Sequence, residues 1–228
     1  MFITDTMPVK VNGFVIARDV KDKVHFGRTA RRNDTASVIL VRMDNGAVAK
    51  LLQVGLRGHG VWVRIHGSLG LMENLRWGNA GMLRIRREPF DKSPDEPVER
   101  IYTPNFPQHH AEAAKSGHGG GDFFMNYHFA TAIRTGRPPY LDVYRGVAMS
   151  VVGILAYRSA FHDSNTIVVP NFRKKEVRDK YRNDDWNPDP ARRQEGYPWP
   201  SVLGNIRPTT KALAYARKDW RDAGYTGK

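Results

Sequence analysis

Apolar and polar residues alternate over several short stretches in the first half of the chain, as they do in half-buried β-strands. At 61–66 every second residue is Val or Ile, and at 82–87 Leu83 and Ile85 alternate with arginines. Further strands are expected at 9–17, 36–42, 47–54, 71–75 and 98–102. Asn45-Gly46 predicts a hairpin with a type I′ turn. Short turns between neighbouring strands predict a largely antiparallel sheet with one face open to a partner.

The apolar period changes to that of helices after residue 121. Asp122 is expected to cap a helix whose apolar face carries Met125, Phe129, Ala132 and Ile133, and Gly136 followed by Pro138-Pro139 ends it.

A second helix is expected from the cap Asp142 to about His162, with a core stripe of Val147, Val151, Ile154 and Leu155. Its small residues, Gly146, Ser150 and Gly153, predict a thin side that another backbone can approach closely. A last short strand is expected at 167–169.

The segment from Pro170 is charged and rich in proline, and its Trp186, Tyr197 and Trp199 indicate that it is anchored. Residues 209–223 predict a short amphipathic helix with Leu213, Ala216 and Trp220 on one side. We therefore expect an α/β domain for substrate binding and oligomerisation at 1–172, truncated at its N-terminus, and a basic, proline-rich extension at 173–228.

Composition predicts a globular protein, since 40% of the 228 residues are hydrophobic and 11% are aromatic. The absence of cysteine excludes disulfides and thiolate chemistry. No apolar run approaches the roughly 18 residues of a membrane span, and the N-terminus does not resemble a signal peptide. A cytoplasmic location without a membrane partner is expected.

The net charge of +13 raises the hypothesis of nucleic-acid binding. Residues 171–228 carry 14 Lys or Arg against 8 Asp or Glu, but basic and acidic residues are mixed and no run of five basic residues occurs. A basic but otherwise ordinary surface is the favoured interpretation.

Several motifs follow one another in a characteristic order and spacing over roughly residues 5–175. They are His118-Gly-Gly-Gly-Asp122, Phe129-x-x-Ala132-Ile133-Arg134-x-Gly136-x-Pro138-Pro139, Asp142-Val-Tyr144 and a helix ending Ala156-x-x-Ser159-Ala160. This arrangement resembles the C-terminal domain of the Gfo/Idh/MocA (glucose-fructose oxidoreductase and inositol dehydrogenase-like) oxidoreductases.

The resemblance implies an α+β fold, with an open, mostly antiparallel sheet and helices packed on one face. In the full-length family a Rossmann domain binds NAD or NADP, and the second domain binds a sugar or polyol and forms homo-oligomers through its sheet face. The reaction implied is hydride transfer between a carbohydrate carbon and nicotinamide. Some relatives, including NAD-dependent α-N-acetylgalactosaminidases, use a transient oxidation to drive glycoside elimination.

The sequence departs from the family in its nucleotide-binding chemistry. No G-x-G-x-x-G element follows an N-terminal strand. The glycine run 117–121 follows a loop, and Asp122 beside it would repel a pyrophosphate. The family's Glu-Lys-Pro lysine and its His or Asp acid/base are also missing. We expect no cofactor to bind to this chain alone and leave the catalytic residues unassigned. Catalysis is expected to need a Rossmann domain, which a separate chain could supply. A split gene, a partial reading frame and a minimal relative each explain this pattern.

The expected substrate-binding residues are His118, Arg57, His59, Trp62 and Tyr127. The resemblance places His118 and the segment around Arg57 and His59 beside the substrate, where imidazole and guanidinium groups suit hydroxyls. Trp62 could stack on a sugar face. Each residue also has a purely structural alternative. His118 could fix its loop by bonding to the backbone, Arg57 and His59 could form an ordinary exposed basic turn, and Trp62 and Tyr127 could be packing residues.

No metal site is expected, because His109-His110 lacks helical i, i+4 spacing and companion acids. Three hypotheses follow. The first is a sugar- or polyol-binding domain of an NAD(P)-dependent oxidoreductase, inactive alone. The second is a noncatalytic carbohydrate-binding or oligomer-scaffold module. The least favoured is a basic nucleic-acid-binding protein.

Overall fold

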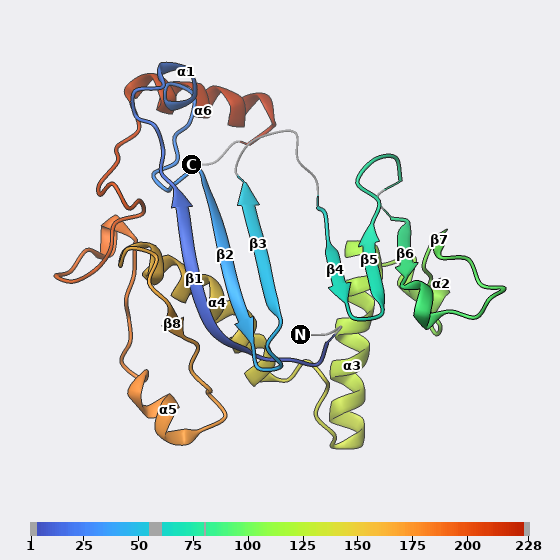
Figure 1. Ribbon diagram of the computed structural model, residues 1–228. Helices are drawn as coiled ribbons and strands as arrows, with labels where there is room; N and C mark the ends of the chain where they lie inside the picture. Colours follow the sequence, from blue (N-terminus) through green and yellow to red (C-terminus); the bar gives the residue numbers. More distant parts are fainter. Residues whose placement is uncertain (1–3, 55–60, 80, 226–228) are drawn as a thin grey trace. The chain divides into compact units, whose positions relative to one another are not determined.

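The computed structural model describes residues 4–54, 61–79 and 81–225. These residues fall into two compact units, one within Met1–Arg57 and Leu141–Lys228 and the other within Gly58–Tyr140 (Figure 1). Each unit contains one four-stranded sheet, and every strand pairing in both sheets is antiparallel. The expected α+β class with open antiparallel sheets is confirmed, and the strands are divided between two sheets.

The sheet of the first unit has the order β3-β2-β1-β8. Its strands are β1 (Pro8–Ile16), β2 (Ala36–Met43), β3 (Val48–Val54) and β8 (Ile167–Val168). β8 comes from far along the chain and pairs with β1, so that Lys10 lies opposite Val168. The central strand β1 is thus hydrogen-bonded on both sides.

The hairpin between β2 and β3 forms where Asn45-Gly46 predicted it, but its turn is not of type I′. Gly46 N donates to Met43 O at 3.0 Å, and Met43 N donates to Ala47 O at 2.9 Å. Only Gly46 has a positive φ, of 88°, whereas a type I′ turn needs two such residues in succession. The glycine therefore serves as the left-handed residue that ends a three-residue loop.

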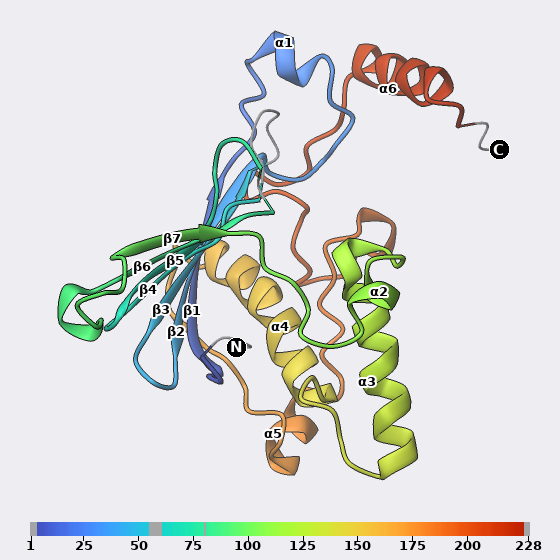
Figure 2. The same cartoon turned by 90° about the vertical axis from the view of Figure 1, so that its right-hand side faces the viewer.

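Helix α4 (Val143–Ala160) lies across one face of this sheet (Figure 2). The core between them is formed by aliphatic residues from the strands and the helix: Val11, Val41, Met43, Val152, Leu155, Ala156 and Val169. The closest approach is at Gly13 of β1, where an added Cβ would lie 2.0 Å from the Ala156 carbonyl oxygen. Ser159, fully buried, reinforces this contact, because its Oγ accepts from Gly13 N at 3.0 Å and donates to Asn165 O at 2.6 Å.

The predicted core stripe of α4 was right for Leu155, which is buried, and for Val151, which packs against the core, and wrong for Val147 and Ile154. The buried residues are Ala148, Val152, Leu155, Ala156 and Ser159, whereas Val147 and Ile154 are 38% and 52% exposed. The small residues that meet the sheet are therefore Ala156 and Ser159. Gly146 and Gly153, expected to be approached closely, have nothing within 4 Å of an added Cβ.

The C-terminal segment is anchored on the first unit, as its aromatic residues predicted. The Tyr157 hydroxyl donates to Trp199 O, and the Trp186 ring meets the Tyr157 ring edge-on with centroids 5.7 Å apart. Ser201 Oγ donates to Asp34 Oδ1 at 2.5 Å, so the segment is also tied to the loop before β2.

The remaining helices of the first unit are short or peripheral. They are α1 (Lys23–Phe26), α5 (Lys175–Lys180), η3 (Pro190–Arg192) and α6 (Thr210–Asp222). α6 agrees with the helix expected at 209–223, and Thr209 caps it by accepting from Ala212 N at 3.1 Å. Among the helices of the described chain, none has the length and apolar character needed to cross a membrane.

The sheet of the second unit has the order β4-β5-β6-β7. Its strands are β4 (Arg64–Gly67), β5 (Gly70–Asn74), β6 (Leu83–Arg87) and β7 (Glu99–Tyr102), and the unit also contains η1 (Pro89–Asp91), α2 (His110–Ala113), η2 (His118–Gly120) and α3 (Gly121–Thr135). The buried carboxylate of Glu73 joins three strands through Arg64, at 2.6 Å, and Arg84, at 2.9 Å.

Replacing Gly13 with Ala should destabilise the first unit by about 1 to 3 kcal/mol or more, because the new methyl group would overlap a helix carbonyl rather than a movable side chain. Urea unfolding measures the change. Gly153→Ala is the matched control: its Cβ meets open space, and alanine favours the helix interior by up to ~1 kcal/mol. Equal unfolding midpoints for the two variants would contradict the assigned contact.

Asp142 caps α4, since its Oδ1 accepts from Arg145 N at 2.8 Å. This bond, and then the guanidinium of Arg173, lower the pKa of Asp142. Asp142→Ala should cost about 1 kcal/mol of unfolding free energy at neutral pH. A lowered folded-state pKa means that the stabilisation is present above the unfolded-state pKa and is lost as the pH falls through the folded-state pKa. The difference from wild type, measured by urea unfolding, should therefore shrink in acid.

Candidate functional site

The loop 116–120, just before α3, has an unusual backbone. Three successive residues, His118, Gly119 and Gly120, have φ values of 52°, 62° and 97°. For a histidine this conformation is unfavourable, and such strain is found most often at functional sites. Ser116 holds the loop to α3, because its Oγ accepts from Phe123 N at 3.2 Å and donates to Ala113 O at 3.0 Å.

The strained histidine forms a pair with Asp122. His118 Nδ1 lies 2.9 Å and 3.0 Å from the two carboxylate oxygens of Asp122. An ionised carboxylate only accepts, so Nδ1 carries the proton and the neutral ring presents the Nε2 lone pair. The His118 side chain is 86% exposed, which leaves Nε2 open to a ligand.

Asp122 is therefore not the helix cap that the sequence predicted. α3 begins one residue earlier, at Gly121, and its N-cap position is Gly120, which has no side chain to cap with. Asp122 lies in the first turn, and its carboxylate is directed to His118. Gly117 permits this, since a Cβ there would lie 2.4 Å from Asp122 Oδ2. The predicted stop at Gly136 is confirmed, with φ of 67°.

Tyr127 belongs to an aromatic cluster on α3 and α2. Its ring centroid lies 4.6 Å from that of His109 and 5.8 Å from that of Phe123, to which it is nearly parallel. Tyr127 is half-buried, so packing and ligand contact are both open to it. The face that was expected to be the apolar side of this helix is solvent-exposed at Met125, Phe129 and Ile133.

Trp62 is engaged by cations. The guanidinium carbons of Arg64 and Arg76 lie 4.6 Å and 4.8 Å from its ring centroid. Both arginines therefore make cation–π contacts with Trp62, and these contacts leave less of the indole surface available to a sugar. Arg57 and His59, the other two expected binding residues, lie outside the described residues.

The glycine run does not fit a dinucleotide. A Cβ at Gly120 would lie 2.6 Å from the Phe106 ring, so this glycine accommodates an internal neighbour, as Gly117 does. The Asp122 carboxylate in the first turn of α3 would repel a pyrophosphate. Within the described ranges, no group of three or more His, Asp or Glu side chains is placed to hold a metal ion.

Sequence reasoning proposed His118 as a binding residue but did not foresee its pairing with Asp122. The available signal was the spacing of four residues between His118 and Asp122 at the start of a helix. Asp122 was interpreted as a helix cap instead. The cation–π contacts of Arg64 and Arg76 with Trp62 were also missed. Arg76 reaches the indole ring only when the hairpin of β4 and β5 has folded.

The family model described as "Glycosyl hydrolase 109, C-terminal domain" matches residues 55–179. A glycosyl hydrolase family 109 protein of Shewanella woodyi is 41% identical over 58 residues, which are 25% of this chain and 12% of that protein. An alpha-N-acetylgalactosaminidase of Shewanella oneidensis is 40% identical over 58 residues, 25% of this chain and 13% of that protein.

Solved structures show the same fold. An oxidoreductase domain protein from Kribbella flavida matches with a TM-score of 0.53 and 19% identity, covering 74% of this chain and 46% of that one. Levoglucosan dehydrogenase in complex with NADH and L-sorbose matches with a TM-score of 0.53 and 16% identity, covering 72% and 45%. The chain thus spans less than half the length of these structures.

The geometry of the His118 and Asp122 pair predicts the proton position on the imidazole. Neutral His118 should be the Nδ1–H tautomer, because Nδ1 faces a carboxylate. Long-range ¹H–¹⁵N spectra of the histidine rings report the tautomer directly. In Asp122→Ala the His118 ring should revert to mainly Nε2–H, while His66, in β4, stays unchanged. An unaltered His118 tautomer in this variant would contradict the pairing.

Proposed function

Because the chain belongs to the family of glycosyl hydrolase 109 C-terminal domains, we propose that it is the sugar- or polyol-binding domain of an NAD(P)-dependent enzyme. The enzyme's chemistry would be hydride transfer between a carbohydrate carbon and nicotinamide, used either for net oxidation or to drive glycoside cleavage. The proposal divides the chain into a binding domain at 1–172 and a basic extension at 173–228.

The similar proteins support a carbohydrate ligand. One curated relative is named alpha-N-acetylgalactosaminidase. One similar structure is a levoglucosan dehydrogenase with NADH and L-sorbose, and another, with a TM-score of 0.50 and 19% identity, is an aldose-aldose oxidoreductase from Caulobacter crescentus with glycerol. All three names concern polyhydroxylated substrates.

The observation that carries the proposal is the exposed His118 imidazole, held at Nδ1 by Asp122. A neutral ring fixed in this way offers Nε2 to a sugar hydroxyl, which donates its hydrogen. The fixed orientation matters, because a ring already held in position loses little freedom on binding. Trp62 and Tyr127, in the same unit as His118, are further proposed ligands, with aromatic groups suited to the apolar faces of sugar rings. Arg57 and His59, outside the described residues, remain proposed ligands for hydroxyls.

The nicotinamide cofactor would be bound by a Rossmann domain, within a longer protein or on a separate chain, since the residues at Gly117–Gly120 do not fit it. A further proposed partner is a second copy of the chain. The sheet face of the first unit that is turned away from α4 exposes Phe14, Leu40 and Leu52, and burying apolar strand surface of this kind would favour association.

Calorimetric titration with N-acetylgalactosamine, glucose and myo-inositol tests the binding function. His118→Ala should weaken binding about fivefold to tenfold, the worth of one hydrogen bond of ~1 to 1.4 kcal/mol. His66→Ala, an exposed histidine of the same unit, is the control and should bind as wild type does.

Two results would count against the proposal. If none of the three probes binds at millimolar concentration, the domain is not a carbohydrate-binding one on its own. Tight NADH binding by this chain, seen as enhanced nicotinamide fluorescence, would show that the cofactor site was misjudged. Sugar binding that stays noncatalytic after a Rossmann domain is supplied would favour the alternative, a carbohydrate-binding or scaffold module.

A further inference from the structure

A separate pocket lies in the first unit, where neighbouring positions of β1, β2 and β3 carry Val15, Ser37 and Gln53. Its volume is about 340 Å³, at the small end of ligand pockets. Further lining residues come from the loop 31–35 before β2 and from α4, which contributes Tyr157.

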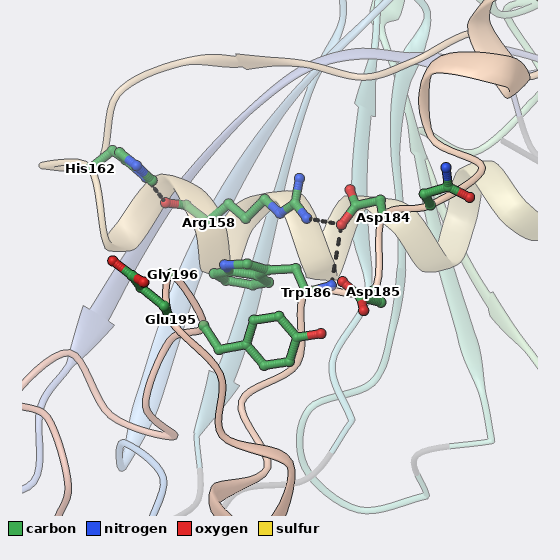
Figure 3. A pocket seen from close by; sticks show the side chains of 9 residues that line it. Arg158, His162, Asp184, Asp185, Trp186, Glu195 and Gly196 are labelled. Atoms are coloured by element: carbon green, nitrogen blue, oxygen red, sulfur yellow. Dashed lines mark hydrogen bonds and ion pairs between the residues drawn. The ribbon is translucent and has the colours of Figure 1, made fainter.

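The C-terminal segment completes the lining with two prolines, Pro188 and Pro200. This segment is attached to α4 just before Pro188. The Arg158 side chain donates to Asp184, and its guanidinium carbon lies 4.8 Å from the centre of the Trp186 ring (Figure 3). Proline side chains have almost no rotamer freedom to lose when a ligand packs on them. The prolines therefore offer a fixed apolar wall.

The row of strand residues is polar at a place where the rest of that sheet face is apolar. Ser37 lies opposite Val15 on one side and Gln53 on the other, so the three side chains share one face of the sheet. This is also the face of Ile39 and Val41, which belong to the core against α4. Within the described part of the chain, the side chains of Ser37 and Gln53 make no hydrogen bond. A half-buried hydroxyl and a primary amide are thus left to bind water or a ligand.

The only carboxylate of the lining is already fully used. Asp34 Oδ1 accepts from Ser201 Oγ at 2.5 Å, and Asp34 Oδ2 accepts from Val202 N at 3.0 Å. Arg31, three residues earlier in the loop, forms no ion pair with any residue that the structure describes. Its guanidinium is therefore available to an anion.

A second arginine behind the lining makes the charge of this corner positive. Arg18 is only 8% exposed, and its guanidinium donates to the carbonyl oxygens of Thr29 and Asn33, both at 3.3 Å. Burial, and then the charge of Arg31, lower the pKa of Arg18, whereas Asp34 acts in the opposite direction. Both guanidinium groups stay charged at neutral pH. Two arginines and one carboxylate leave one positive charge, which a bound anion would offset.

We propose that this pocket binds a small sugar acid, a polyhydroxylated ligand with a single carboxylate. The carboxylate would accept from the Arg31 guanidinium, and the sugar hydroxyls would bond Ser37 and Gln53, whose side chains both donate and accept. The Tyr157 ring and the two prolines suit the C–H faces of a sugar ring. A monoanion matches the single excess charge, whereas a phosphate ester would bring a second negative charge towards Asp34.

Glucuronate is the probe, and glucose is its neutral counterpart with the same ring. Calorimetry on the full chain at constant ionic strength should detect glucuronate binding, and Arg31→Gln should weaken it at least tenfold because a charge-assisted contact is lost. The matched control Arg32→Gln removes the same charge one position further on, outside the lining, and should leave binding unchanged. Gln53→Ala should weaken binding about threefold to tenfold.

The pocket shares no residue with the His118 site, and the two proposals can fail separately. In a His118→Ala background, which removes the contribution of the other site, glucuronate should bind at least tenfold more tightly than glucose. Loss of glucose binding with Arg31-sensitive glucuronate binding retained would count against the His118 site alone.

Three outcomes would overturn the sugar-acid proposal. They are no heat from glucuronate up to about 10 mM, equal affinity for the two sugars in the His118→Ala background, and equal losses in Arg31→Gln and Arg32→Gln. Both arginines are exposed loop residues, so their variants should fold, and circular dichroism checks this.

Discussion

The close contact between Gly13 and the Ala156 carbonyl is the constraint on which the first unit depends. A strand with a side chain at this position could not approach α4 so closely, since the Cβ would overlap the helix backbone. The approach brings Ser159 within reach of Gly13 N and Asn165 O, and Asn165 leads into β8, which pairs with β1. One missing methyl group thus fixes the helix, the turn after it and the edge strand together.

This dependence explains which parts of α4 could be predicted from the sequence. The cap Asp142 was correct because capping is a local property, decided by residues three apart. Only half of the buried stripe was correct, because both sides of this helix carry Val, Ile and Leu. Which side faces the sheet is decided by Gly13, a residue about 140 positions away, and a helical period alone contains no information about that partner.

In the second unit, two glycines of the run 117–121 are required by the groups packed beside them. The run 117–121 was recognised as a family motif, yet its local geometry was misread. Gly117 and Gly120 are required by what lies beside them, the Asp122 carboxylate and the Phe106 ring, rather than by flexibility or by a phosphate. Once the carboxylate turns back to His118 it is lost as a helix cap. The choice between the two roles is made by a positive φ at His118, which residue preferences would not predict.

The proposed carbohydrate site at His118 and the anchoring of the C-terminal segment depend on different parts of the molecule. The His118 site needs only the loop 116–120 and the first turn of α3, and its essential pair lies four residues apart. The C-terminal segment is positioned on the first unit by the hydrogen bonds from Tyr157 to Trp199 and from Ser201 to Asp34. Anchoring of the C-terminal segment therefore has no bearing on the geometry of the His118 and Asp122 pair.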